Sequence, residues 1–348
     1  VLTIAGLWGL GTAILEGRAT LQDSSRSGVD LSLATMTLGM GWREQDVADL
    51  LVSERMKLGE GEKALRPGYI EGTIAKARAS VEGDRADEAM AGRLMQGESD
   101  VLSWIQDSDV LVQANPALQP PLIHGLLRLG ETMNIIAAPK VGKSWLALDM
   151  AVSVVTGSRW LDTFECQRGR VLIIDNELHP ATISFRIREV LAARGLTLEA
   201  VGKDLHVLSL RGRIKSLPIL AQELMKLPQG HYSLIIMDAL YRLMPSKTDE
   251  NDNGDMRDIY NLVDNLASHM KAAMALIHHS SKGNQSQKDV TDVGAGAGAQ
   301  SRAADAHVVV RHHEERGVVV MQASNRAWTE FEPLCLRWSF PLWEKADG

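Results

Sequence analysis

The sequence predicts an α/β protein with a mostly parallel central sheet, preceded by a small all-helical domain. From residue 116 onward, short apolar runs alternate with stretches of helical periodicity, which is typical of a parallel sheet covered by helices. Two of these runs, 171–174 and 234–237, are aliphatic throughout, as in central strands that are buried on both faces. Residues 30–77 instead carry apolar side chains at helical spacing, which indicates a separate helical module.

The composition is that of a globular protein, with 45% apolar and 23% charged residues, and a length of 348 residues favours two domains. The formal net charge of −7 restricts any contact with nucleic acid to local basic loops. Cys166 and Cys335 lie far apart without metal-ligand spacing, which favours a reduced, cytoplasmic protein. No apolar run reaches membrane-spanning length, and residues 1–15 lack the basic leader of a signal peptide, so we expect no membrane partner. Because the chain begins at Val1, we expect a fragment or a processed piece.

Three parts are expected along the chain: a helical domain over residues 1–80, a linker over 81–115 and an α/β domain over 116–348. In the first part, the Gly-Met-Gly sequence at 39–41 separates two helices, and a further helix starts near Tyr69. Residues 80–100 lack a sustained apolar stripe and are interpreted as a linker or a solvated helix.

A proline-containing stretch, from Asn115-Pro116 to Pro120-Pro121, marks the entry to the third part. Its apolar runs predict strands over 133–137, 171–175, 205–210, 234–238, 273–278, 307–311 and 318–323, with helices near 143–156, 180–194, 216–227 and 255–271. The short connection at 314–317 predicts that the last two strands form an antiparallel hairpin at the edge of the sheet.

A loop of small residues that ends in Gly-Lys-Ser lies between the first of these strands and the first helix. In this context, successive backbone N–H groups form a nest for phosphates at the positive end of a helix dipole. We expect Lys143 to reach the β- and γ-phosphates of ATP and the Ser144 hydroxyl to bind Mg²⁺. The candidate nucleotide-binding residues are Ala137, Ala138, Pro139, Lys140, Val141, Gly142, Lys143, Ser144 and Trp145, with Ala137 at the position of the usual first glycine.

Two carboxylates follow the aliphatic strands. Asp238 ends the run 234–237 and is expected to bind Mg²⁺ opposite Ser144, although aliphatic strands also end in aspartates that cap turns. Ala239, not a glutamate, follows Asp238, so the candidate for activating water is Glu177, just past the end of the run 171–174. The alternative is that Glu177 only adds a negative charge before the next helix.

Paired histidines end the strand expected over 273–278. A metal site is disfavoured because no Cys, Asp or Glu ligand set accompanies His278 and His279. Neighbouring residues of a strand point to opposite faces, so only one ring should face the nucleotide. We favour His279 as a sensor of the terminal phosphate and expect His278 to be packed or bridged by solvent, with the opposite choice left open.

These motifs together resemble the core of the RepA-like hexameric helicases, over roughly residues 122–343. The resemblance implies a RecA-like P-loop NTPase core that uses ATP and Mg²⁺, with ATP bound between neighbouring subunits of a homo-oligomer, as in a hexameric ring. It also implies loops that face single-stranded DNA, and other replication proteins as partners. Residues 25–34, 41–42, 66–70 and 73–77 further resemble the helical segment that follows the primase–polymerase domain of phage and plasmid primase–helicases.

The resemblance also implies assignments for single residues. Lys143 and Ser144 would bind phosphate and magnesium, Glu177 would be the base, Asp238 the magnesium acid and a histidine at 278–279 the sensor. Relatives carry an arginine finger after the long loop, but no arginine precedes Ala299 here, so Arg302 or Arg311 would have to serve. Arg302 could equally be a charge on a helix surface.

Two loops are candidates for binding nucleic acid, and a solvated loop is the alternative for both. The first carries Lys282, Gln285, Gln287 and Lys288, and the second carries Tyr241, Arg242 and Lys247. Beside an ATP-driven motor, a nucleotide-switched binding protein remains open. A small-molecule kinase of the same loop type fits less well, because the sequence lacks a basic lid segment.

Overall fold

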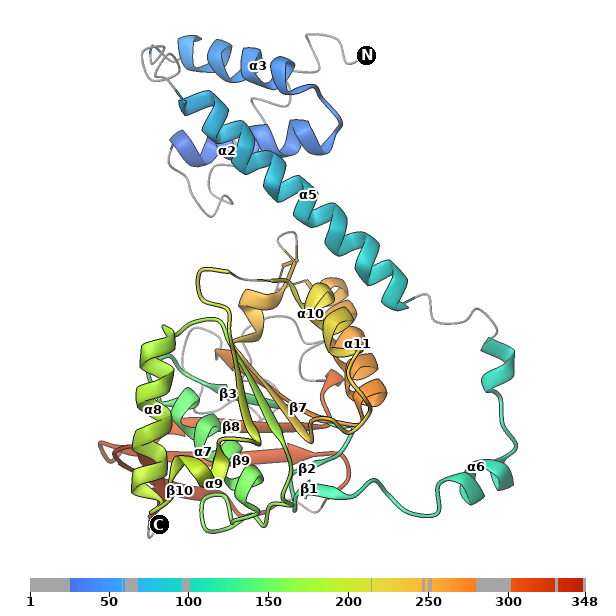
Figure 1. Ribbon diagram of the computed structural model, residues 1–348, viewed down its shortest axis with the longest axis vertical. Helices are drawn as coiled ribbons and strands as arrows, with labels where there is room; N and C mark the ends of the chain where they lie inside the picture. Colours follow the sequence, from blue (N-terminus) through green and yellow to red (C-terminus); the bar gives the residue numbers. More distant parts are fainter. Residues whose placement is uncertain are drawn as a thin grey trace. The chain divides into compact units, whose positions relative to one another are not determined.

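The computed structural model divides the chain into two compact units, Val1–Ala89 and Met90–Gly348 (Figure 1). It describes residues 26–57, 59, 68–95, 101–213, 215–245, 248, 249, 252–279, 302–328 and 331–346, with the backbone alone for 26, 83–95, 101 and 103. Among the described residues, no helix combines the length and the apolar character that a membrane span requires.

The first unit is helical, with α2 over Arg26–Gly39, α3 over Glu44–Lys57 and α5 over Tyr69–Met95. Its core is formed by small and aliphatic side chains that recur at helical spacing, namely Leu33, Ala34, Val47, Leu51, Ile74 and Ala77. A buried ion pair supplements this core: a guanidinium nitrogen of Arg55 lies 2.7 Å from Asp30, and the Tyr69 hydroxyl donates to the same carboxylate over 2.5 Å. One polar cluster therefore links all three helices.

The segment between the helical core and the sheet is more helical than its composition indicated. Residues 81–95 continue α5, so this part of the expected linker is helical. They are followed by a 3₁₀ turn, η2 (Val101–Trp104), and by α6 (Ser108–Ala114), in which every residue is exposed.

The second unit is built on a nine-stranded sheet with the order β11-β10-β9-β8-β3-β7-β6-β4-β5. The neighbours from β8 to β5 pair in parallel, and those from β8 to β11 pair antiparallel. The strands are β3 (Thr132–Ala137), β4 (Val171–Asp175), β5 (Leu205–Ser209), β6 (Leu234–Asp238), β7 (Ala273–His279), β8 (Ala306–His312), β9 (Val318–Asn325), β10 (Leu334–Ser339) and β11 (Leu342–Lys345). A separate pair, β1 (Pro121–Ile123) and β2 (Leu127–Arg128), precedes them.

Helices cover both faces of this sheet (Figure 1). On one face lie α7 (Lys143–Thr156), α8 (Pro180–Ala193) and the single turn α9 (Leu198–Val201); on the other lie α10 (Leu217–Leu224) and α11 (Asn253–Met270). The central strands supply side chains to both cores in alternation. In β4, Ile173 packs with the α7 side, while Leu172 and Ile174 pack with the α10 and α11 side.

The predicted fold class is confirmed: a mostly parallel sheet between helices, with a helical region before it. All seven predicted strands are present with bounds that differ by at most two residues, and the four predicted helices lie within three residues of their observed bounds. One expectation was wrong. The hairpin of β8 and β9 does not form the sheet edge, because β10 and β11 extend the sheet beyond it.

Candidate nucleotide-binding site

The predicted site residues gather at the carboxyl ends of four parallel strands. In the register of the sheet, Ala137 at the end of β3 pairs with His279 at the end of β7. Asp175 at the end of β4 pairs with Asp238 at the end of β6. Parallel strands bring the residues that follow them to one edge of a sheet, and this edge is where ligands bind in open α/β folds.

The loop between β3 and α7 turns tightly enough to require unusual backbone angles. Gly142, which precedes the first residue of α7, has φ of 91°, in the left-handed region that glycine adopts without steric cost. Lys140 also has a positive φ, 66°, which is uncommon for a residue with a Cβ atom. The loop therefore has a compact form in which an anion would lie at the amino end of α7.

Lys143 is held inside this loop. Its ammonium group donates to the carbonyl oxygens of Ala137 (2.8 Å) and Ala138 (3.0 Å), and only 8% of the residue is exposed. Burial lowers the pKa of Lys143, while the negative charges of Asp238 and Glu177 act in the opposite direction. Both predicted carboxylates therefore lie close enough to the lysine to act on its charge.

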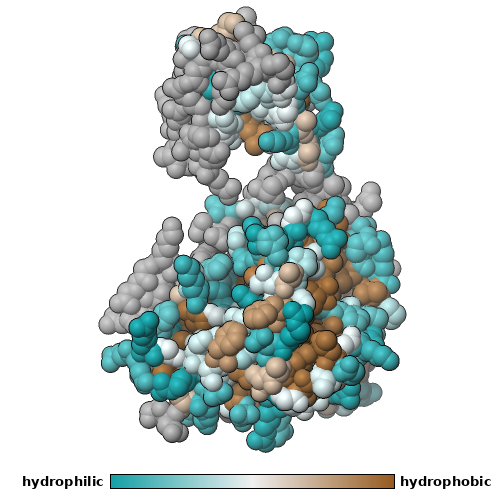
Figure 2. All heavy atoms as spheres, turned by 60° about the vertical axis from the view of Figure 1, so that its left-hand side comes forward, coloured by the Kyte–Doolittle hydropathy of each residue, from teal (hydrophilic) through white to brown (hydrophobic). Residues whose placement is uncertain are grey.

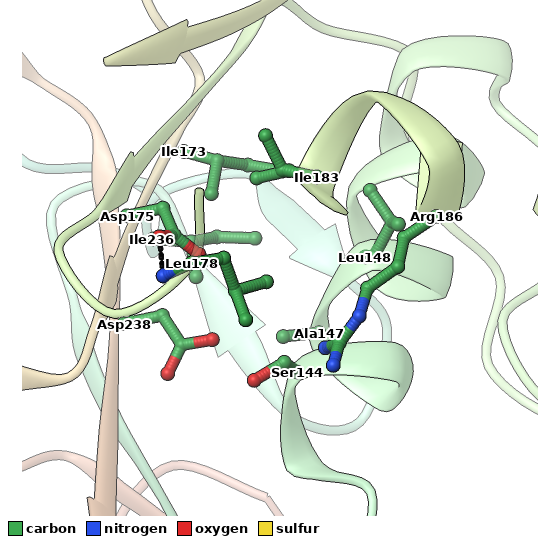
Figure 3. A pocket seen from close by; sticks show the side chains of 10 residues that line it. All are labelled: Ser144, Ala147, Leu148, Ile173, Asp175, Leu178, Ile183, Arg186, Ile236 and Asp238. Atoms are coloured by element: carbon green, nitrogen blue, oxygen red, sulfur yellow. Dashed lines mark hydrogen bonds between the residues drawn. The ribbon is translucent and has the colours of Figure 1, made fainter. Parts of the chain in front are cut away.

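A small cavity beside the loop contains the predicted magnesium ligands (Figure 3). The Ser144 hydroxyl and the Asp238 carboxylate face each other across this cavity in Figure 3. Asp238 is only 5% exposed, and its burial raises its pKa to about 6; Asp175 and Glu177 also raise it, whereas Ser144 and Lys143 lower it. The lining residues are Ser144, Ala147, Leu148, Ile173, Asp175, Leu178, Ile183, Arg186, Ile236 and Asp238.

The donor set of this cavity fits Mg²⁺. Ser144 and Asp238 offer hard oxygen ligands, and Mg²⁺ commonly takes one or two protein ligands while it keeps several waters and binds substrate phosphates. Among the described residues, no group of three or more His, Cys, Asp or Glu side chains could hold a metal ion. Ser144 and Asp238 are therefore the side chains of this cavity that would hold a magnesium ion, together with phosphate oxygens and waters.

Glu177 is fixed by contacts from three directions. Its N–H group donates to Asp175 Oδ1 over 3.1 Å, and its carbonyl oxygen accepts from Arg211 Nη1 over 2.7 Å. Its Oε1 atom accepts a hydrogen bond of 3.2 Å from the Tyr241 hydroxyl. The Glu177 charge acts on Lys143 and on His279, so the structure brings Glu177 to the same side of the sheet as the loop.

The two histidines occupy different environments. His279 Nδ1 lies 3.2 Å from Lys143 Nζ, and burial together with the lysine charge lowers the pKa of His279. His278 is 5% exposed, and this burial lowers its pKa to about 3. Its Nε2 atom lies 3.2 Å from both Asn134 Oδ1 and the Tyr260 hydroxyl. His279 therefore lies at the loop, whereas His278 belongs to a polar cluster in the interior.

The structure does not bring Arg302 to the loop of its own chain. Arg302 is exposed and precedes β8, whose first residue pairs with Met133 near the beginning of β3, so it lies at the opposite edge of the sheet. Arg311 comes one residue after Val310, the partner of Ala137, and donates to Gln322 over 2.7 Å. Lys282, Gln285, Gln287, Lys288 and Lys247, which were candidates for binding nucleic acid, lie outside the described residues.

Two residues of the cavity had not been expected from the sequence. Arg186 extends from α8 toward Ser144 (Figure 3), and its guanidinium carbon lies 4.7 Å from the centre of the Trp145 ring. Burial lowers the pKa of Arg186, with Asp238, Asp175 and Glu177 opposing that effect. Asp175 ends an aliphatic strand as Asp238 does, a signal that could have found it, whereas no sequence signal shows which face of α8 carries Arg186.

The last strands also contribute to the surroundings of the loop. The Trp145 ring packs edge-on against Trp338 and Phe340, with ring centres 6.1 Å and 5.4 Å away. A Cβ atom placed on Gly142 would lie 3.2 Å from Trp343 Nε1. Trp338 and Trp343 therefore pack the last strands, and they also support the phosphate loop. Figure 2 is turned so that the α8 side of Figure 1 comes forward, and apolar and polar side chains are interspersed over the surface that it shows.

This arrangement of strand, loop, helix and strand-end acids defines a P-loop ATPase with the RecA-type fold. The family model for the AAA domain matches residues 98–285, more than half of the 348 residues, and the chain belongs to this family. A solved ATPase domain has a similar structure, with 13% sequence identity and a TM-score of 0.50 over 72% of this chain and 100% of that chain. A structure of the RadB recombinase matches with 16% identity and a TM-score of 0.46, over 64% of this chain and 93% of that chain.

Proposed function

We propose that this protein hydrolyses ATP with Mg²⁺ and uses the hydrolysis to act as an oligomeric motor on single-stranded DNA, as a replicative helicase or a helicase-like ATPase. The observation that carries the proposal is the convergence of Lys143, Glu177, Asp238 and His279 at one edge of the sheet. These side chains come from four separate parts of the chain, so their convergence is a property of the fold and not of a local motif.

The bound nucleotide is expected to redistribute the contacts of Lys143. The lysine donates to two carbonyl oxygens of its own loop, and phosphate oxygens would replace them. Ser144 and Asp238 would hold Mg²⁺, which when bound neutralises charge on the phosphates. Arg186 lines the same cavity, and its guanidinium group lies near Ser144 (Figure 3). It would add a second positive charge beside the phosphates.

Glu177 is the proposed base. A carboxylate beside the terminal phosphate can orient the attacking water and accept its proton. His279 lies between Lys143 and Tyr241, where its ring can respond to the terminal phosphate and its loss. An arginine from a neighbouring subunit, Arg302 or Arg311, would complete the site, and Arg302 lies far from the loop of its own chain, as a residue acting in another subunit would.

The nucleic-acid part of the proposal rests on the resemblance to RepA-like helicases and on the surface beside Glu177. The exposed side chains of Arg211, Arg213 and Tyr241 follow β5 and β6 at the carboxyl edge of the sheet. Cationic and aromatic side chains are the groups that bind the backbone and the bases of a single strand. The proposal further includes a homo-oligomer in the form of a hexameric ring, other replication proteins as partners and a cytoplasmic location. Cys166 and Cys335 are both free thiols, which is consistent with a reducing compartment.

The test is the rate of ATP hydrolysis by the full chain with and without single-stranded DNA, together with the particle mass. We expect single-stranded DNA to stimulate hydrolysis, and the stimulation to weaken as the salt concentration rises. The logarithm of the DNA-binding constant should fall with the logarithm of the salt concentration, with a slope near −0.7 per phosphate contact. Glu177→Gln should lower kcat by roughly 10²- to 10⁴-fold and leave ATP binding intact. Glu223→Gln is the matched control, because Glu223 on α10 forms an exposed ion pair with Lys226, which follows this helix.

Wild-type turnover in Glu177→Gln would remove Glu177 as the base. Hydrolysis by the assembled oligomer that does not respond to DNA would instead support the alternative, a nucleotide-switched binding protein whose slow hydrolysis controls assembly with partners.

A further inference from the structure

Tyr241 contacts two of the proposed functional side chains at once. It belongs to the 3₁₀ turn η3 (Leu240–Leu243) that follows β6. Its hydroxyl donates to Glu177 Oε1 over 3.2 Å, and its ring centre lies 5.7 Å from that of His279. Tyr241 is nevertheless 43% exposed, so the side chain is held by these two contacts more than by packing in the core.

The main chain around Glu177 is held independently of Tyr241. The Asn176 side chain bonds both backbone groups of Ala239, accepting from its N–H group over 3.1 Å and donating to its carbonyl oxygen over 2.9 Å. Arg242 donates to the Asn176 carbonyl oxygen (2.6 Å), and Arg211 donates to the Glu177 carbonyl oxygen (2.7 Å). The end of β4 and the start of η3 are thereby fixed to each other, and so is the distance between their side chains.

These contacts leave the side-chain torsions of Glu177 as its remaining freedom. A glutamate has three such torsions, and a free long side chain populates many rotamers. A base that must meet a water molecule in one position works best when its rotamer is fixed in advance. The Tyr241 hydroxyl bonds the carboxylate of Glu177 and can fix it in this way.

We propose that Tyr241 is a positioning residue: its hydroxyl orients the Glu177 carboxylate for activation of the attacking water. The inference rests on the proposed function, because it takes Glu177 as the base. Tyr241 itself touches neither nucleotide nor water in this role and acts through Glu177. Its ring contact with His279 is separate from this role, and a phenylalanine would retain it.

The test is Tyr241→Phe in the full chain, with kcat and the KM for ATP measured with and without single-stranded DNA. Loss of one hydrogen bond to a charged group, at a residue that is nearly half exposed, should lower kcat by roughly 3- to 10-fold. The KM for ATP and the binding of a fluorescent ATP analogue should stay unchanged, because no nucleotide contact is removed. Tyr232→Phe is the matched control: its hydroxyl lies 2.9 Å from His206 Nδ1, outside the proposed site.

A second measurement separates orientation of Glu177 from a general structural effect. In a Glu177→Ala background, Tyr241→Phe should have no further effect on the single-turnover rate, because the carboxylate that it orients is absent. Equal reductions of kcat in both backgrounds would overturn the proposal, and so would an unchanged or raised kcat in the single variant. If Glu177→Gln lowers kcat but Tyr241→Phe does not, only this inference fails; if neither does, the proposed base fails with it.

Discussion

Gly142→Ala tests whether the phosphate loop needs its glycine. The residue has φ of 91°, in the left-handed region, and it immediately precedes α7. The substitution adds one methyl group, which changes neither the charge of the loop nor the side chains that contact phosphate. Any effect on ATP binding must therefore arise from the backbone of the loop or from the packing behind it.

The magnitude has a conformational and a steric part. A non-glycine residue in the left-handed region costs about 1–2 kcal/mol. The new Cβ atom would also lie 3.2 Å from Trp343 Nε1 and 3.4 Å from Trp343 Cζ2, so the indole must move by a few tenths of an ångström or the loop must open. At roughly 2–4 °C per kcal/mol for a domain of this size, the conformational part alone should lower Tm by about 2–8 °C.

Gly230→Ala separates the two parts. Gly230 has φ of 72° in the turn before β6, and an added Cβ atom would have no neighbour within 4 Å. We expect thermal unfolding to show a smaller loss of Tm for Gly230→Ala than for Gly142→Ala. Titration with ATP and Mg²⁺ should show wild-type affinity for Gly230→Ala and an affinity about tenfold lower or worse for Gly142→Ala, because only there do the N–H groups of the loop move. Equal losses of Tm with intact ATP affinity in both variants would refute the reasoning.

Two further predictions concern buried charges. Burial raises the pKa of Asp238 to about 6, so the folded protein binds a proton at this carboxylate more tightly than the unfolded chain does. The contribution of Asp238 to the free energy of unfolding therefore falls as pH rises from about 4 through 6. Asp238→Asn should therefore raise the Tm of the nucleotide-free protein at pH 8 more than at pH 5 and abolish the added stability from ATP with Mg²⁺; an unchanged response to ATP with Mg²⁺ would contradict the assignment. Arg55→Ala leaves Asp30 buried without its ion pair and should cost the helical unit about 3–5 kcal/mol, seen as lost helical circular dichroism with ATP hydrolysis retained. Arg43→Ala, which breaks an exposed pair with Asp46, is its control, and an equally small effect of both would contradict a structural role for the buried pair.

The central part of the fold could be predicted because its strands are long and buried on both faces. The runs 171–174 and 234–237 leave little choice of secondary structure, and the strands they predicted have the observed bounds. The strands β1 and β2 were missed because two or three residues carry no periodic signal. The strands β10 and β11 were missed because exposed polar side chains interrupt their apolar positions.

The residues at strand ends could be predicted for a related reason. Once strands are parallel, residues that follow them share one edge, so Glu177, Asp238 and His279 were expected near Lys143 without any knowledge of side-chain contacts. Arg186 and Tyr241 could not be found in this way, because their positions depend on how α8 and η3 pack against the sheet. The register of β8 with β3 places Arg302 at the amino end of β3, away from the phosphate loop of its own chain, so a role for Arg302 in a neighbouring subunit stays a prediction.

The charges of the site indicate which form of the nucleotide it suits. Asp175, Glu177 and Asp238 bring their carboxylates to one edge of the sheet, close to the cations Lys143 and Arg186. A triphosphate without a metal would add several negative charges beside these acids and would be repelled. Mg²⁺ held by Ser144 and Asp238 would offset that repulsion, and it would also offset the cost of burying Asp238 in its ionised form. Because burial makes an ionised Asp238 costly without a ligand, we expect the site to bind the magnesium complex of ATP more tightly than the free nucleotide.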